Sequence, residues 1–329
     1  MRMLFISRDK RTHQLFRKSW IKASDSSDND VIVMFRKSQG LLFFLISVFK
    51  HKLLLRKICV FGVSEALVLS FLSPNLIVIT GLGRLLMPSQ KFRKLFFFII
   101  KFFYKNRLIV VLNMNDLRIF RSIGCQKCIL INGEGIDLTS IRAFNNQNLD
   151  FNPRRNKNFL YAGRLLKSKN VDQLVDYFDE LFDQDDPNMS ATLTLVGDND
   201  FGSPDSVNEK TLQRVASKHP DKFKLVGYQS DVKPFMKGCD VYISLSKREG
   251  LPFSVVEALA LGCECILSDV PGHKAFKPLA GVTLVKGMAQ FENAVYGALQ
   301  RTALENAPSL EEFSQETIVK DIHSILCKL

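Results

Sequence analysis

The feature of this sequence that most restricts its fold is the alternation of short apolar runs with longer amphipathic stretches along the whole chain. Short apolar runs suit buried strands, and longer amphipathic stretches suit helices. Their regular alternation favours βαβ units and hence parallel sheets, the α/β class. In the first half, strands are expected at 3–6, 31–35, 58–60, 76–80, 108–112 and 128–130, and helices at 64–72, 91–104 and 115–123.

A polar stretch at residues 145–157 interrupts this alternation and contains Pro153, so it is interpreted as a linker. A chain of 329 residues suits two domains, which the linker places at 1–150 and 151–329. After the linker, strands are expected at 158–162, 192–196, 223–226, 241–244, 265–267 and 282–285, and helices at 171–182, 231–237, 252–261, 289–301 and 316–329.

Glycines and polar residues follow the expected strands of the second half. In open parallel sheets, ligands bind beyond the carboxyl ends of the strands. The sequence therefore predicts a binding site built from five segments, residues 163–164, 197–198, 227–228, 246–252 and 268–272.

The segment 246–258 runs from a loop into a helix that begins near Pro252. The free N–H groups and the dipole of a helix start favour an anion. Glu249 lies in the loop, and Glu257 lies in an otherwise apolar helix, where a buried carboxylate needs hydrogen-bond donors such as a sugar diol. The alternative is that Glu249 is an ordinary loop acid and Glu257 faces solvent, because short acidic spacings are common.

The segment 162–170 also joins a strand to a helix. Gly163 permits a close approach of the backbone, Arg164 offers a planar fork to a phosphate, and Lys169 adds a point charge. Two cations at this position would stabilise a departing pyrophosphate. The alternative is that Lys167 and Lys169 are solvated lysines at a helix start.

Together these segments give the chain a resemblance to the family-4 retaining glycosyltransferases of the GT-B fold, over about residues 155–329. It is most similar to the bacterial members that build lipopolysaccharide O-antigen or capsule repeat units. The resemblance implies two Rossmann-like domains whose parallel sheets face each other across an interdomain cleft. The matching segments are Gly163-Arg164 with Lys169, Gly197-Asp198, residues 239–246, residues 249–257 and residues 268–272.

The resemblance also implies roles for individual residues. Arg164 and Lys169 would bind the donor diphosphate, Glu249 would bind the donor sugar, and Glu257 would bind the nucleotide ribose. Further donor contacts would come from Gly163, Gly197, Gly250, Leu251, Pro252 and Phe253. The implied reaction transfers a hexosyl or N-acetylhexosaminyl group from a UDP- or GDP-sugar with retention, without a metal or cofactor. The departing phosphate oxygen would take the acceptor proton.

The first half resembles the family less closely. Its expected acceptor-side turn contains Thr80, Gly81 and Gly83. The Gly-x-Gly pair in this turn is not followed by the third glycine of a dinucleotide-binding motif, so it does not indicate NAD binding. Ser7-Arg8-Asp9 stands where the family has a Gly-Gly turn after the first strand. The first half also contains no histidine in a context like that of the family's catalytic region. The alternative function is therefore a non-catalytic nucleotide-sugar-binding or scaffold subunit with a degenerate acceptor domain.

Charge divides unevenly: residues 1–150 have a balance of +15, and the remainder has −3. A basic half suggests an anionic partner, such as lipid headgroups, a lipid-linked pyrophosphate or nucleic acid. The resemblance favours a lipid-linked saccharide acceptor at the cytoplasmic face of the cytoplasmic membrane, and no nucleic acid. Residues 40–49 and 91–105 are apolar with basic flanks, are too short to span a bilayer, and suit either interfacial or core helices.

Weaker signals are interpreted as structural. The seven cysteines are expected to be reduced thiols, and Cys125 and Cys128 lack the second pair of a zinc site. Three Asp-x-Asp pairs, at 28/30, 183/185 and 198/200, are attributed to chance, so no metal site is expected. His273 could face the pocket, although a lone histidine is more often structural.

Overall fold

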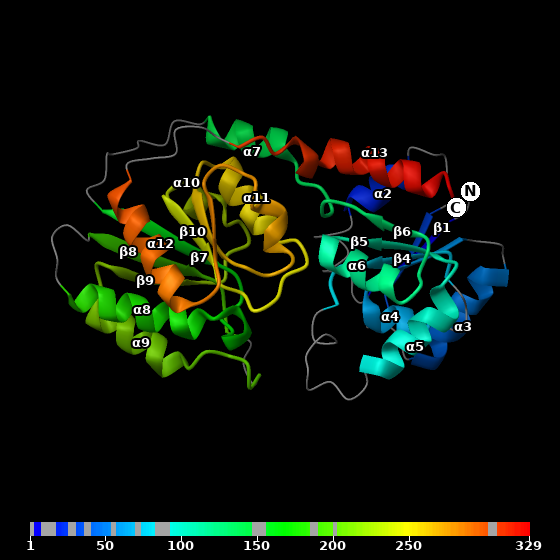
Figure 1. Cartoon of the computed structure of the whole chain (residues 1–329), viewed down its shortest axis with the longest axis horizontal. Helices are drawn as coiled ribbons and strands as arrows, with labels where there is room; N and C mark the ends of the chain where they lie inside the picture. Colours follow the sequence, from blue (N-terminus) through cyan, green and yellow to red (C-terminus); the bar gives the residue numbers. More distant parts are fainter. Residues whose placement is uncertain are drawn as a thin grey trace. The chain divides into compact units, whose positions relative to one another are not determined.

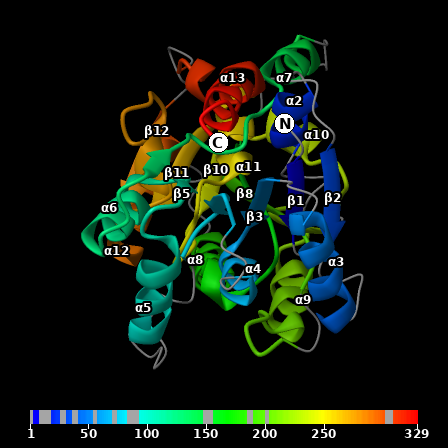
Figure 2. The same ribbon diagram turned by 90° about the vertical axis from the view of Figure 1, so that its right-hand side faces the viewer.

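The chain forms two compact units, each built around its own six-stranded parallel sheet (Figures 1 and 2). The first unit comprises Met1–Asp137 and Glu311–Leu329, and the second comprises Leu138–Leu310. The computed structural model describes residues 3–7, 18–25, 31–35, 41–53, 57–69, 74–82, 93–146, 156–184, 190–199, 203–301 and 308–329.

The sheet of the first unit has the strand order β2-β1-β3-β4-β5-β6. Its strands are β1 Met3–Ser7, β2 Val31–Phe35, β3 Lys57–Phe61, β4 Leu76–Ile79, β5 Leu108–Val111 and β6 Cys128–Leu130. Every residue of β1 is buried, as expected for a strand covered on both faces. One face carries α3 Leu41–Leu53, α4 Val63–Val68, α5 Arg93–Tyr104 and α6 Met114–Ser122, and the other carries α2 Lys18–Asp25 and α13 Gln315–Leu326 (Figure 1).

The second unit has the order β12-β11-β10-β7-β8-β9. Its strands are β7 Lys157–Ala162, β8 Ala191–Val196, β9 Phe223–Gly227, β10 Val241–Ser244, β11 Glu264–Ser268 and β12 Val282–Val285. Its helices are α7 Leu138–Asn145, α8 Val171–Asp183, α9 Glu209–Lys218, α10 Lys233–Lys237, α11 Phe253–Ala260 and α12 Met288–Gln300. Because all strands are parallel, the loops after them gather at one edge of the sheet.

The predicted fold class, two Rossmann-like parallel-sheet domains, is confirmed. Every expected strand is present, with ends within one residue of the expected ones. Helices α2, α7 and α9 were not expected. In α9 only Leu212 and Val215 are buried, so its apolar stripe is too thin to stand out in the sequence. Most of the expected linker, residues 147–155, lies outside the described residues.

The division into units differs from the expected boundary between residues 150 and 151. The second unit begins at Leu138, and residues 311–329 return to the first unit. The reason is the apolar face of α13: Ile318 and Ile322 are fully buried in the same core cluster as Trp20 of α2. The backbone N–H of Gln315 also donates to the carbonyl of Ile136 at 2.7 Å. Both views in Figures 1 and 2 place α13 beside α2.

We therefore expect Ile322→Ala to destabilise the first unit by about 2–5 kcal/mol, because it leaves a cavity in that core. Trp20 is the single tryptophan of the chain and is 1% exposed in this core. Its fluorescence during urea unfolding therefore reports on the first unit. Ser324→Ala, at an exposed position of the same helix, is the control. Equal midpoints for the two variants would show that α13 does not belong to this core.

Candidate functional site

Glycine turns lie side by side at the carboxyl ends of β7, β8 and β9. The N–H of Gly163 donates to Val196 O at 2.9 Å, and the N–H of Gly197 donates to Gly227 O at 2.8 Å. Gly197 has φ +144°, and a Cβ there would lie 2.8 Å from the carbonyl carbon of Gly163 and closer still to its oxygen. Only glycine fits at 197, so the residue type predicted for this turn has a steric reason.

Arg164 follows the first of these turns and is exposed. Its carbonyl accepts a 2.7 Å hydrogen bond from the Tyr161 hydroxyl. Burial raises the pKa of Tyr161, the Glu249 carboxylate raises it further, and Arg164 opposes them. Two charged side chains far apart in the sequence therefore act on one phenol. Sequence reasoning missed Tyr161, although an aromatic residue just before the Gly-Arg turn was visible.

Lys169 and Glu249 form an ion pair, with 24% and 17% of their side chains exposed. The family resemblance implies different partners for them, a diphosphate for Lys169 and a sugar for Glu249, whereas the structure pairs them with each other. Two contacts bring their segments together. The N–H of Lys247 donates to Ser168 O at 3.0 Å, and the Asn170 side-chain amide donates to Leu245 O at 2.8 Å.

The loop that carries Glu249 rests on Gly272. A Cβ at Gly272 would lie 2.6 Å from Glu249 O and closer still to Gly250 O, so the loop approaches this backbone as closely as glycine allows. The next residue, His273, is fully buried, and its Nδ1–H donates to Ser268 O at 2.8 Å. Burial lowers the pKa of His273, which favours the neutral ring. Of the two roles left open for His273, the structure supports the structural one.

Helix α11 begins after Pro252 and presents Glu257 in its middle. Glu257 is half-buried, and its carboxylate makes no hydrogen bond to any residue that the structure describes. Burial raises the pKa of Glu257, while Lys233 opposes this and Asp231 adds to it. A half-buried carboxylate without a protein donor can accept hydrogen bonds from a ligand, so the ribose-binding role of Glu257 stays a prediction.

The other predicted donor-side residues lie in the same loop and helix start. Gly250, Pro252 and Phe253 are half-buried, whereas Leu251 is only 7% exposed. Leu251 is therefore a buried side chain. The N–H of Tyr228 donates to Asp198 Oδ1 at 3.0 Å, which joins the turns after β8 and β9.

The predicted acceptor-side turn belongs to the first unit and follows β4. Thr80 and Gly81 are half-buried there, and Gly83 lies outside the described residues. The N–H of Leu82 donates to Asp116 Oδ2 at 3.3 Å, and Asn113 Nδ2 donates to the same oxygen at 3.0 Å. Burial raises the pKa of Asp116, and these hydrogen bonds oppose the rise. Asp116 therefore fixes the turn to the start of α6.

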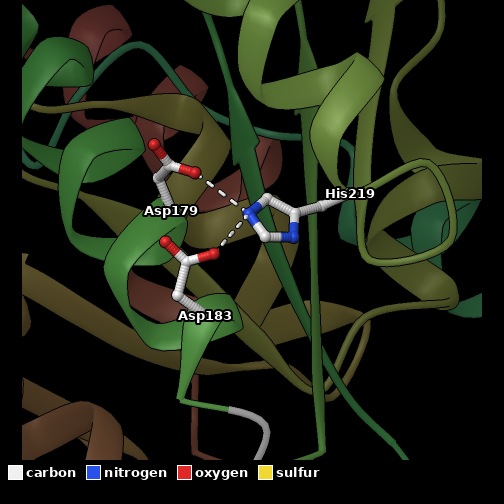
Figure 3. Close-up of side chains that lie close together, drawn as sticks. All are labelled: Asp179, Asp183 and His219. Atoms are coloured by element: carbon white, nitrogen blue, oxygen red, sulfur yellow. Dashed lines mark hydrogen bonds and ion pairs between the residues drawn. The ribbon is translucent and has the colours of Figure 1, made fainter.

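A second group of ionisable side chains lies at the end of α8, where the carboxylates of Asp179 and Asp183 both point at Nε2 of His219 (Figure 3). The two distances are 2.9 and 3.6 Å. Cations neutralise these acids: Arg214 lies 2.8 Å from Asp179, and Lys218 lies 2.5 Å from Asp183. Burial opposes ionisation of Asp179, but hydrogen bonds from these neighbours outweigh it and lower its pKa. The group is an ion-pair network.

This network stands apart from the glycine turns. Because α8 runs back from the turn after β7, its last residues lie at the opposite edge of the sheet. The three ligand-type atoms lie within 4.8 Å of one another, but Arg214 and Lys218 already supply the positive charge that a metal ion would bring. Elsewhere, none of the seven cysteines forms a disulfide.

Sequence comparison finds a known family in the second unit. Residues 145–276 match the family described as "Glycosyl transferases group 1". One relative is the UDP-Gal:alpha-D-GlcNAc-diphosphoundecaprenol alpha-1,3-galactosyltransferase of Escherichia coli, which is 26% identical over 83 residues. That match covers 25% of this chain and only 20% of the relative.

Solved structures match over the whole chain. HepE of Anabaena in complex with UDP has a TM-score of 0.73 and 19% identity, with 100% of both chains covered. Sucrose-phosphate synthase of Thermosynechococcus elongatus has a TM-score of 0.74 and 17% identity, covering 100% of this chain and 98% of that one. At these identities the likeness shows the fold, and the fold is GT-B.

Proposed function

We propose that this chain is a retaining glycosyltransferase that moves a sugar from a UDP- or GDP-sugar to a lipid-linked saccharide in the synthesis of a bacterial surface polysaccharide. The observation that carries the proposal is the grouping of Arg164, Lys169 and Glu249 beside the glycine turns. This group lies in the segment that matches the group 1 glycosyl transferases. Support for the donor comes from HepE, whose structures contain UDP and UDP-glucose.

In the proposed reaction, Arg164 and Lys169 bind the donor diphosphate and stabilise the charge that builds as the glycosidic bond breaks. Arg164 suits this role because it is an exposed residue that directly follows the Gly163 turn, and a guanidinium can bind phosphate oxygens through two N–H groups. Glu249 holds Lys169 through one carboxylate oxygen, Oε1, which leaves Oε2 for a sugar hydroxyl. The departing phosphate oxygen accepts the proton of the acceptor hydroxyl, so the reaction needs no protein nucleophile, metal or cofactor.

The acceptor is proposed on separate grounds. The Escherichia coli relative acts on a diphosphoundecaprenol-linked sugar, as its name states. The strongly basic first half suits such an anionic lipid at the cytoplasmic face of the membrane. Thr80, Gly81 and Gly83 are the proposed acceptor-side residues. The competing function, a binding subunit without activity, predicts that the protein holds a nucleotide sugar but neither transfers nor hydrolyses it.

The donor assignment is tested by thermal unfolding with a panel of UDP- and GDP-sugars, using Glu257→Gln as the diagnostic variant. A true donor at a hundred times its Kd should stabilise the wild type by about 2.7 kcal/mol. Glu257→Gln should lose most of this gain, since the ionised carboxylate is the proposed ribose acceptor. The free variant should be at least as stable as the wild type near pH 7, because burial raises the pKa of Glu257.

The effect of Glu257 on the free energy of unfolding depends on pH, because its pKa differs between the folded and unfolded chain. Below its pKa in the unfolded chain, Glu257 is protonated in both states and does not lower stability. Above it, the fold must hold a charge that burial disfavours, so stability is lost as pH rises. Glu292→Gln, at an exposed position on α12, is the control. Absence of stabilisation by every sugar nucleotide would contradict the proposed function, and equal stabilisation of Glu257→Gln would contradict the role of Glu257.

A further inference from the structure

Exposed large apolar side chains are concentrated on two helices of the first unit. Among the described residues, eleven large hydrophobic side chains are exposed, and seven of them lie on α3 and α5, with exposures between 52% and 72%. The other four are scattered over the rest of the chain. The seven are Leu41, Phe43, Ile46, Phe49 and Leu53 on α3, and Phe98 and Phe102 on α5.

These helices are well anchored on their inner faces. Phe44 and Val48 of α3 and Tyr104 of α5 are fully buried in one core cluster on the sheet. Both helices therefore cover the same face of the sheet, with α4 between them in Figure 2, and their outer faces point away from it. The sequence left open whether the two segments are core helices or interfacial helices. They are core helices on one face and carry exposed apolar groups on the other, where the rings of Phe98 and Phe102 stack on each other.

The charge around these groups is of one sign. Between residues 31 and 115 the chain has 13 Lys and Arg but a single carboxylate, Glu65, which is 3% exposed. The helices themselves carry exposed lysines at 50, 52, 94 and 101. Exposed phenylalanines surrounded by lysines and no exposed acid are typical of a surface that inserts into the headgroup region of an anionic bilayer.

We propose that the outer faces of α3 and α5 form a docking surface for an anionic lipid bilayer. The phenylalanines insert at the boundary of headgroups and acyl chains, and the lysines contact lipid phosphates. A second copy of the chain fits this surface less well, because it would bring lysines against lysines. No described helix has the length and apolar character to cross a membrane. The inference rests on the proposed function in one respect: a lipid-linked acceptor would lie in the same bilayer.

The test is co-sedimentation of the full chain with vesicles of phosphatidylethanolamine and phosphatidylglycerol, compared with phosphatidylcholine alone. We expect binding to the anionic vesicles and weak binding to the neutral ones. Phe49→Ser with Phe102→Ser should lower the partition coefficient about a hundredfold. Lys50→Glu with Lys101→Glu should lower it about tenfold or more, on anionic vesicles only. The control is Tyr296→Ser, which removes a 52% exposed aromatic from the second unit.

Trp20 fluorescence shows that each variant is folded, and stabilisation by the sugar nucleotide shows that the donor site is intact. The proposal is overturned if wild type does not bind anionic vesicles, or if the phenylalanine variant binds like wild type. It is also overturned if light scattering finds a dimer that the phenylalanine variant dissociates. Failure of vesicle binding with normal nucleotide stabilisation removes the docking surface and leaves the proposed function standing. Normal vesicle binding without stabilisation by any sugar nucleotide would contradict the proposed function and leave the docking surface standing.

Discussion

Glu249→Ala is expected to lower kcat/KM for sugar transfer by about 10²–10³-fold. The proposed role of Glu249 is twofold: it binds the sugar, and it holds Lys169, which binds the departing diphosphate. The variant loses the sugar contact and also frees Lys169, which the ion pair now holds in place. The chain should remain folded. Both side chains are partly exposed, and such a pair contributes only about 0–1 kcal/mol to stability.

The measurement is the initial rate of transfer with the donor found by thermal unfolding. Glu249→Gln separates charge from shape: it keeps the side-chain volume but cannot hold Lys169 as an ion pair, so it should also be impaired. Arg164→Ala should reduce the rate to a similar extent. Glu292→Ala serves as the matched control, since it removes an exposed glutamate from α12. Turnover like that of the wild type in folded Glu249→Ala would refute the assignment.

Gly272→Ala should cost at least about 10²-fold in kcat/KM, although Gly272 is not one of the proposed donor-binding or catalytic residues. Its φ of −69° and ψ of −29° are open to any residue, so the backbone accepts alanine. The obstacle is steric. The new methyl would lie 2.6 Å from Glu249 O and closer to Gly250 O, so the loop that carries Glu249 must move. A displacement of about 1 Å in a catalytic group can cost this much.

The matched control is Gly287→Ala. Gly287 has an extended φ of 175°, and a Cβ there would meet nothing within 4 Å. This variant should transfer sugar at the wild-type rate. Trp20 fluorescence should show unchanged unfolding of the first unit in both variants, which confines the effect of Gly272→Ala to the second unit. Equal rates for the two variants would mean that the loop tolerates the methyl group and that its close approach to Gly272 is unimportant for function.

Local pattern alone predicted the strands, because a buried strand is a short apolar run and is legible within a few residues. The same holds for the glycine turns, since a glycine after such a run marks the point where the chain must leave the sheet. Helix α9 was not predicted because it has no apolar pattern that stands out over a few residues. It is mostly polar, and only Leu212 and Val215 are buried.

Short-range patterns were therefore enough to predict the two parallel sheets and the polar, charged turns beyond their strands. Three features became visible only in the folded chain: α13 completes the first core, Lys169 pairs with Glu249, and the Glu249 loop rests on Gly272. The difference lies in the sequence distance over which each interaction acts. Periodicity and turn chemistry act over a few neighbouring residues, whereas Lys169 and Glu249 are 80 positions apart and meet only because packing brings their strands together.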